Sequence, residues 1–340
     1  MTTGSPATQR VCLLLADLSG YTAYLAASEP ERAPAMVADL VETVVRQLRP
    51  TFRLEKLEGD AAFMVAPLDG LTGAALIDAL DATVLAFQAR LRSMAQATTC
   101  DCEACRRIPE LDLKFVVHAG TVVSQRVAGR TELAGTDAII AHRLLKAETP
   151  SNVGSVRYAL LTDAAVRLLG LDAAAVGLRT GVEQFEYLGE IEVYLLDLAA
   201  RSAAEQPPWN PPRRRPVLEA ELRVPLAPMA LWERLTAPAE RARWEGLQNI
   251  EEIDGSARRG VGTVTACIAD RLSTVEEIVD WRPFETFVRT VKLPGNRRLT
   301  ARHRLEPDGT GTRLRISWWG APPVSVHAQR GHERLLQLAG

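Results

Sequence analysis

Two aspartates at the ends of predicted strands are the first residues whose type and position suggest chemistry. Asp17 ends an apolar run, and the small and polar residues after it form a turn whose backbone N–H groups would face an anion at the start of a helix. Asp60 lies in the tight turn Glu58-Gly59-Asp60. If this hairpin pairs beside the first strand, both carboxylates would hold Mg²⁺ together with phosphate oxygens. On spacing alone, the alternative is that both aspartates only form turns.

Three cysteines, Cys100, Cys102 and Cys105, form the second group. Three thiolates this close together can converge on one ion, because zinc accepts sulfur ligands in a tetrahedral shell. We therefore predict a structural Zn²⁺ here, with the fourth ligand left open between His118, Cys12, a second subunit and water. The alternative is three free thiols in a reducing cytosol, because the cysteine pattern is not that of a secreted disulfide framework.

The elements that must position these residues follow from the hydrophobic pattern. In the first two hundred residues, short apolar runs alternate with segments of helical spacing. The resulting order is β-α-β-β-α-β, which is typical of ferredoxin-like α+β folds. The expected elements are a strand at 11–16, a helix at 30–48, a hairpin at 52–67, a helix at 71–94, a strand at 111–120 and a helix at 137–147.

A proline-rich segment divides the chain. Five prolines between Ala203 and Pro216 interrupt regular structure, so we predict a linker there, with Arg213-Arg214-Arg215 as its solvated basic part. After the linker, the pattern predicts one strand, one or two short helices within 228–244, four or five antiparallel strands and a last helix at about 324–338. The expected domains are residues 10–200 and 217–340, joined by the linker 201–216.

Four segments of the first domain resemble class III adenylate and guanylate cyclases, in the order in which that family has them. These segments are ADLSGYT at 16–22, KLEGDAAF at 56–63, His118-Ala119-Gly120, and ELAGTDAIIAHRLLK at 132–146. The resemblance implies a ferredoxin-like βαββαβ domain that binds ATP or a related nucleotide with Mg²⁺ or Mn²⁺, and that works as a homodimer.

The resemblance also implies a role for each matching residue. Asp17 and Asp60 match the metal ligands, and Leu18, Ser19, Gly20, Tyr21 and Thr22 match the turn at the metal and phosphates. Lys56 and Glu132 match the positions that bind adenine, and Arg143 matches the catalytic arginine. Two departures favour weak turnover: Ile139 replaces the transition-state asparagine, and no lysine occurs at 188–190, near where the family holds the triphosphate.

The second domain resembles the START-like helix-grip superfamily, also called SRPBCC, which includes polyketide cyclases and lipid carriers. The resemblance is carried by Leu231-Trp232 through Trp244 and by the strands that end at RLRISWWG. It implies a curved antiparallel sheet around a helix, with a cavity for a hydrophobic small molecule. Trp244, Trp281 and Trp318 are candidates to line that cavity, or they are ordinary core residues.

Composition narrows the remaining classes of function. A net charge of -2 argues against nucleic acid as a partner, and no apolar run is long enough for a membrane span, so we expect a cytoplasmic protein. The leading hypothesis is a cyclase-like nucleotide-binding protein, a degenerate or weak adenylate cyclase, coupled to a hydrophobic-ligand domain. One alternative is an active adenylate cyclase that makes cyclic AMP from ATP. The other is a START-like binding protein whose cyclase-like domain serves only as a dimerisation scaffold.

Overall fold

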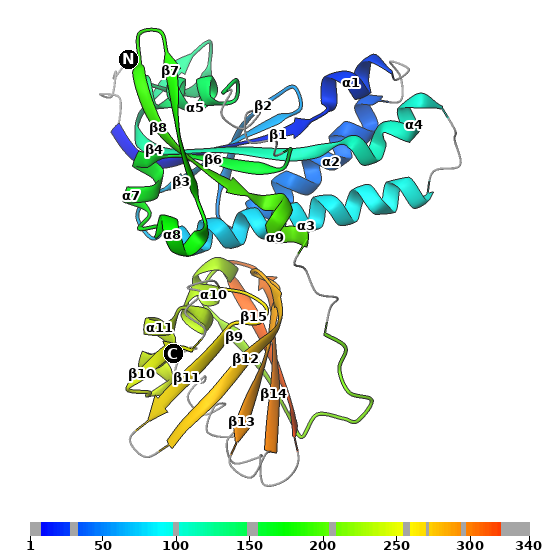
Figure 1. The fold of residues 1–340 in the computed structure, drawn as a ribbon, viewed down its shortest axis with the longest axis vertical. Coiled ribbons are helices and arrows are strands. Elements are labelled where there is room, and N and C mark those ends of the chain that lie inside the picture. The colour runs from blue at the N-terminus through cyan, green and yellow to red at the C-terminus, as the bar shows by residue number, and fades with distance from the viewer. Residues whose placement is uncertain are drawn as a thin grey trace. The chain divides into compact units, whose positions relative to one another are not determined.

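A mixed eight-stranded sheet forms the centre of the first part of the chain (Figure 1). The computed structural model describes residues 8–27, 33–97, 102–147, 156–203, 209–253, 259–269, 272–293 and 297–320. The chain divides into two compact units, residues 1–204 and 205–340.

The strands of the first unit lie in the order β2-β3-β1-β4-β6-β8-β7, and β5 pairs with the far end of β4. All pairs are antiparallel except β4 with β6. Their bounds are β1 Thr8–Ser19, β2 Arg53–Glu58, β3 Ala61–Pro67, β4 Asp112–Val127, β5 Arg130–Ala134, β6 Tyr158–Thr162, β7 Arg179–Phe185 and β8 Gly189–Asp197.

Helices cover both faces of this sheet because its central strand, β1, is apolar on both sides. Val11, Leu13 and Leu15 pack in the core under helix α5, Thr136–Leu144. The alternate residues of β1 point to the opposite face, which the long helices α2, Ala33–Leu48, and α3, Gly73–Ala97, cover (Figure 1). The shorter helices are α1 Tyr21–Ala26, α4 Glu103–Arg107, η1 Ile108–Glu110, α7 Asp163–Leu168, α8 Ala173–Val176 and α9 Leu198–Ala203.

The α+β class predicted from the sequence is confirmed, but the first unit contains more strands than the predicted βαββαβ order. Glu132 lies on strand β5, whereas the sequence predicted only the helix that follows this strand. Strands β6 to β8 extend the sheet beyond the six predicted elements. The cysteine segment is partly helical, because Cys105 lies in α4 and Cys102 directly precedes it. Cys100 lies outside the described residues.

The second unit is a seven-stranded antiparallel sheet in the order β10-β11-β12-β13-β14-β15-β9, with two short helices against it (Figure 1). Each helix starts at a proline, where the missing N–H costs no hydrogen bond. The predicted last helix at 324–338 lies outside the described residues. The elements are β9 Leu218–Val224, α10 Pro228–Thr236, α11 Pro238–Glu245, β10 Asn249–Glu252, β11 Val264–Ala269, β12 Leu272–Arg282, β13 Thr286–Leu293, β14 Arg297–Asp308 and β15 Gly311–Gly320.

The segment at 209–217 contacts this second sheet. Trp209 packs edge-on against Trp319 with 5.2 Å between ring centroids, and its backbone N–H donates to Asp280 at 3.1 Å. The Trp319 indole N–H donates to the Arg214 carbonyl at 3.2 Å. The basic run is exposed, as the sequence indicated, but its backbone is held against the second unit rather than surrounded by solvent.

Among the described residues, no helix is both long enough and apolar enough to cross a membrane.

One polar contact fixes α5 on the sheet. The Asp137 carboxylate lies 3.1 Å from His118 Nε2 and accepts the Thr121 backbone N–H at 2.6 Å. His118 Nδ1 lies 2.9 Å from the hydroxyl of Thr162, which caps α7. Gly120 makes this approach possible, because a Cβ atom there would lie 2.3 Å from the Asp137 carboxyl group.

We predict that Gly120→Ala lowers the free energy of unfolding of the first unit by about 1–3 kcal/mol, the usual cost of overpacking. The reason is that the added methyl group displaces Asp137 from β4. Denaturation followed by circular dichroism measures the effect. In an Asp137→Gly background, where both the clashing carboxyl group and the Cβ atom of residue 137, 2.9 Å from the added methyl position, are gone, the same substitution should cost much less. An equal cost in both backgrounds would contradict this account of the contact.

Candidate functional site

Four polar side chains lie next to one another across the strands of the first sheet, on the face that α5 covers. They are Asp60 at the β2–β3 turn, Asp17 on β1, Lys114 on β4 and Tyr158 on β6. Asp17 is the register partner of Lys114, which is in turn the partner of Tyr158. The side chains of β1 and β4 alternate, so Asp17 and Lys114 continue the rows of Leu15 and of Val116. We call these four residues the polar row.

The two predicted metal ligands therefore come together. Asp17 and Asp60 are within hydrogen-bond reach of each other. Burial and the neighbouring charge of Asp17 raise the pKa of Asp60 to about 6. Lys114 Nζ lies 2.8 Å from Asp17 Oδ2 and partly offsets this repulsion. Burial and the charges of Asp17 and Glu183 raise the pKa of Tyr158 to about 12, so its phenol stays protonated.

The turn after Asp17 has the shape that the sequence predicted. Gly20 adopts φ +84°, and a Cβ atom there would lie 3.1 Å from the Glu110 carbonyl oxygen, so both the conformation and the close approach require glycine. The turn leads into α1, which has six residues. Leu18 is buried, whereas Ser19 and Tyr21 are half-buried and Thr22 is exposed beside the polar row.

Lys56 lies on β2 in a second polar group, which also includes a histidine of α5. Its Nζ is 2.6 Å from Glu58 Oε1 and 5.7 Å from the centre of the Phe63 ring. Glu58 in turn lies 3.2 Å from His142 Nδ1, and the His142 ring is 4.9 Å from that of Phe63. Burial lowers the pKa of His142 despite the Glu58 charge, so this imidazole is neutral at pH 7.

Within one copy of the chain, the remaining predicted site residues do not lie beside the two aspartates. Glu132 is the register partner of Gln125, eleven residues beyond Lys114 on β4. At about 3.3 Å per residue, this separation is roughly 35 Å of strand. Ile139 and Arg143 are exposed on α5, and 52% of the Ile139 surface is accessible. One nucleotide can contact Asp17 and Glu132 together only if two copies of the chain supply them.

The Asp137 carboxylate, on the same helix as Ile139, is engaged by His118 and by the Thr121 backbone N–H. Strand register separates two candidates for the fourth ligand, Cys12 and His118, from the cysteine group. Cys12 and His118 lie beside Ala119 and Leu13 in the middle of the β1–β4 pair. Helix α4 precedes the start of β4 at Asp112, about 20 Å of strand away from them. Among the described residues, no three potential ligands converge on one point.

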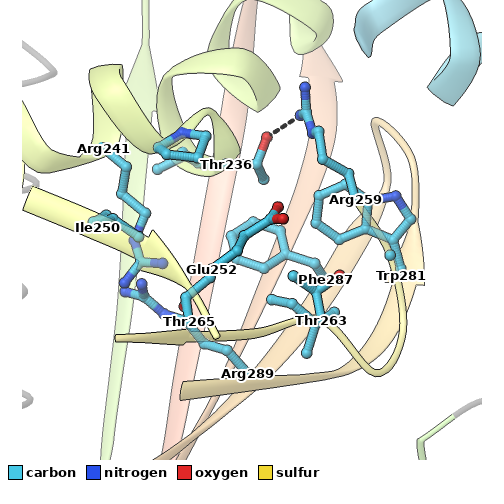
Figure 2. Close-up of a pocket in the computed structure, with 14 residues that line it drawn as sticks. Thr236, Arg241, Ile250, Glu252, Arg259, Thr263, Thr265, Trp281, Phe287 and Arg289 are labelled. Atoms are coloured by element: carbon cyan, nitrogen blue, oxygen red, sulfur yellow. Dashed lines mark hydrogen bonds between the residues drawn. The ribbon is translucent and has the colours of Figure 1, made fainter. Parts of the chain in front are cut away.

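The second unit contains a pocket between its sheet and its two helices (Figure 2). Apolar walls come from Leu235, Ile250, Ile278, Trp281 and Phe287, so one of the three tryptophan candidates lines it. Trp232 packs edge-on against Trp281 at 4.7 Å behind this wall. The free volume is about 40 Å³, room for a few water molecules and well below the volume of a typical ligand cavity.

A buried network of charges lies beside this pocket. The Arg241 guanidinium contacts Glu245 at 2.7 Å and also contacts Glu276, and Arg289 lies 2.9 Å from Glu245. Figure 2 shows the two arginines of this network, Arg241 and Arg289, at the pocket. Burial alone would raise the pKa of Glu245, but the two guanidiniums hold it well below its usual range. The network is therefore internally neutral, as buried charges must be.

His303 lies near this network and is 1% exposed. Its ring stacks on Phe287 with 4.3 Å between centroids, and its Nδ1 has no hydrogen-bond partner among the residues that the structure describes. Burial and the nearby positive charge of Arg289 lower its pKa well below the usual value.

Sequence reasoning missed Lys114, Tyr158 and the buried charges of the second unit. A lysine inside the apolar run LDLKFVVH was the available signal for Lys114, because a central strand has little reason to bury a charge without a partner.

Each unit is similar to known proteins. The first is structurally like class III adenylyl and guanylyl cyclases, and the second is a polyketide cyclase/SRPBCC domain. The family model described as "Polyketide cyclase / dehydrase and lipid transport" matches residues 215–337. The model described as "Protein of unknown function (DUF2652)" matches residues 37–153.

The chain belongs to the family of the uncharacterized protein Rv2561/Rv2562 of Mycobacterium tuberculosis. The two are 35% identical over 176 residues, which cover 52% of this chain and 78% of the relative.

Solved structures resemble each unit. A bacterial light-regulated adenylyl cyclase matches 58% of this chain with a TM-score of 0.44 and 15% identity. The match spans only about half, 53%, of that cyclase. Protein MLL2253 from Mesorhizobium loti matches 36% of this chain and 94% of its own length, with a TM-score of 0.31 and 24% identity.

We predict that His303 makes the second unit less stable in mild acid. Its folded pKa lies below its unfolded pKa, so the unfolded state binds the extra proton. Stability is therefore full above about pH 6.5 and falls as the pH decreases, by about 1.4 kcal/mol per pH unit for one proton. All six tryptophans follow residue 205, so tryptophan fluorescence during denaturation reports this unit alone.

His303→Phe preserves the stacking on Phe287 and removes the titrating ring. The difference in stability between the two proteins should grow from pH 7 to pH 5.5. A difference that does not change with pH would contradict the prediction.

Proposed function

We propose that the first unit binds a purine nucleoside triphosphate with a divalent metal ion, and that it turns the nucleotide over weakly. The observation that carries this proposal is the convergence of Asp17 and Asp60 at the edge of an exposed glycine turn. Two carboxylates that repel each other at close range are a site whose energy a cation lowers. This pair therefore fits Mg²⁺ or Mn²⁺.

The metal would be held by Asp17, Asp60 and the Leu18 carbonyl oxygen, with phosphate oxygens completing its shell. When bound, such an ion screens phosphate charge and polarises a phosphoryl oxygen. Two carboxylates are few for a stable metal centre without a ligand, so we expect nucleotide and metal to bind together. The turn from Ser19 to Thr22 offers backbone N–H groups to the same phosphates.

We further propose that two copies of the chain complete the site. Glu132 and Lys56, the adenine candidates, and Arg143, the candidate for stabilising phosphoryl charge, would come from one copy and the aspartates from the other. The exposed Arg143 and the long separation of Glu132 from Asp17 along β4 support this arrangement. Ile139 lies at the position where a hydrogen-bond donor is expected, and its apolar side chain supports a low rate. Losing one preorganised donor typically costs about 10²–10³ in rate.

A second candidate function belongs to the SRPBCC unit, a domain class that suggests binding of a hydrophobic ligand. The aromatic pocket at Trp281 and Phe287 supports a small apolar molecule as its occupant. Because the free volume is small, we expect ligand entry to move the pocket walls and change tryptophan fluorescence. Fatty acids and aromatic polyketides that leave this fluorescence unchanged would argue against the second candidate.

The proposal predicts that Asp60→Ala abolishes metal-dependent ATP binding, because it removes one of the two metal ligands. Titration calorimetry with ATP and Mn²⁺ measures this loss. Asp69→Ala, which removes an exposed carboxylate from the loop after β3, is the matched control and should bind as the native protein does.

Ile139→Asn should leave the affinity in the same titration nearly unchanged. It should raise the rate of cyclic AMP formation, because the new donor acts only on the transition state. No ATP binding by the native protein would refute the proposal. A native rate in the ordinary enzyme range of about 1–10³ per second would refute weak turnover.

A further inference from the structure

Lys114 is a cation in the centre of the polar row. Its ammonium lies 2.8 Å from Asp17 Oδ2, with 24% of the lysine side chain and 17% of the aspartate side chain exposed. Its charge also acts on Asp60. Neighbouring strands fix it from both sides, because Lys114 has Asp17 as its register partner on β1 and Tyr158 on β6.

This position differs from that of an ordinary surface lysine. Lys56 pairs with Glu58 on the edge strand β2, where 44% of the lysine side chain is exposed, and solvent screens such a pair. Lys114 lies on a central strand, flanked by its register partners Asp17 and Tyr158, and only 24% of its side chain is exposed. Its long side chain therefore has little freedom to leave the aspartates, and its charge is weakly screened.

The charge of the site follows directly. Two carboxylates and one ammonium give a net charge of about -1 when all three are ionised. Two divalent ions bridged by two carboxylates need oxygens on both sides of each carboxylate. Here the ammonium already occupies Oδ2 of Asp17, and it would repel a second ion placed at that oxygen.

We propose that Lys114 takes the place of one of two metal ions, so that the polar row binds a nucleotide with a single divalent cation. This inference rests on the proposed function, because it concerns the same nucleotide site. Lys114 is then the residue that sets the metal stoichiometry. The cation held by the protein neutralises Asp17, and the exchangeable ion contacts Asp60 and the phosphates.

The test counts bound metal rather than activity. The full chain is equilibrated with Mn²⁺ and α,β-methylene-ATP, whose α–β bridge cannot be cleaved, and bound Mn²⁺ and nucleotide are measured by dialysis. The native protein should bind about one Mn²⁺ per nucleotide, and Lys114→Met about two, because Oδ2 of Asp17 becomes available. Lys114→Arg keeps the charge and should remain at about one. Lys292→Met, which removes the same charge from β13 of the second unit, should also remain at about one.

The outcomes separate this inference from the proposed function. Two Mn²⁺ per nucleotide in the native protein would overturn the role of Lys114 and leave nucleotide binding intact. One Mn²⁺ in both the native protein and a folded Lys114→Met would also overturn it. No bound nucleotide in any variant would refute the proposed function itself. If Lys114→Met does not fold, a native ratio of two still contradicts the inference without any variant.

Discussion

The antiparallel pairing of β1 with β4 is the constraint on which the rest of the first unit depends. It runs over the whole of β1 and joins Thr8 to Val123 at one end and Ser19 to Asp112 at the other. A slip of one residue would turn the apolar row of β1 to the other face and separate Asp17 from Lys114. Register is strongly specified here because both faces of β1 are buried.

Two parts of this strand pair carry different polar groups. At the end near Ser19, polar side chains from three neighbouring strands and from the β2–β3 turn gather where the apolar rows stop, and all four are partly exposed. Near the middle of the pair, His118, Gly120 and Asp137 hold α5 against the sheet. Because α5 carries Arg143 and Ile139, the anchor decides where these exposed residues lie for a second copy. The proposed nucleotide site, shared between two copies, would use both the polar row and the residues that α5 presents.

Charged side chains are balanced differently in the second unit. The first unit leaves Asp17, Asp60 and Lys114 partly exposed with an incomplete balance of charge. The second buries Arg241, Glu245, Glu276 and Arg289 as a balanced set beside an aromatic pocket. A balanced network has little tendency to bind an ion, and breaking it would leave an uncompensated charge in the interior. This contrast is why we propose metal and phosphate chemistry for the first unit and an apolar ligand for the second.

The sequence by itself determined the class of each unit, the two aspartates and the glycine turn between strand and helix. These features are local, because an apolar run, a helical period or a tight turn is encoded by residues close together in the chain. Only the tertiary structure decided that Lys114 and Tyr158 complete the polar row and that Glu132 lies far along β4 from Asp17. It also decided that Asp137 anchors α5 to the sheet. Those facts depend on strand register and on contacts between residues distant in the chain, and hydrophobic periodicity carries no information about either. The buried network around Arg241 could not be predicted for the same reason. In the sequence each of its charged residues resembles a surface residue, and only the folded sheet buries it.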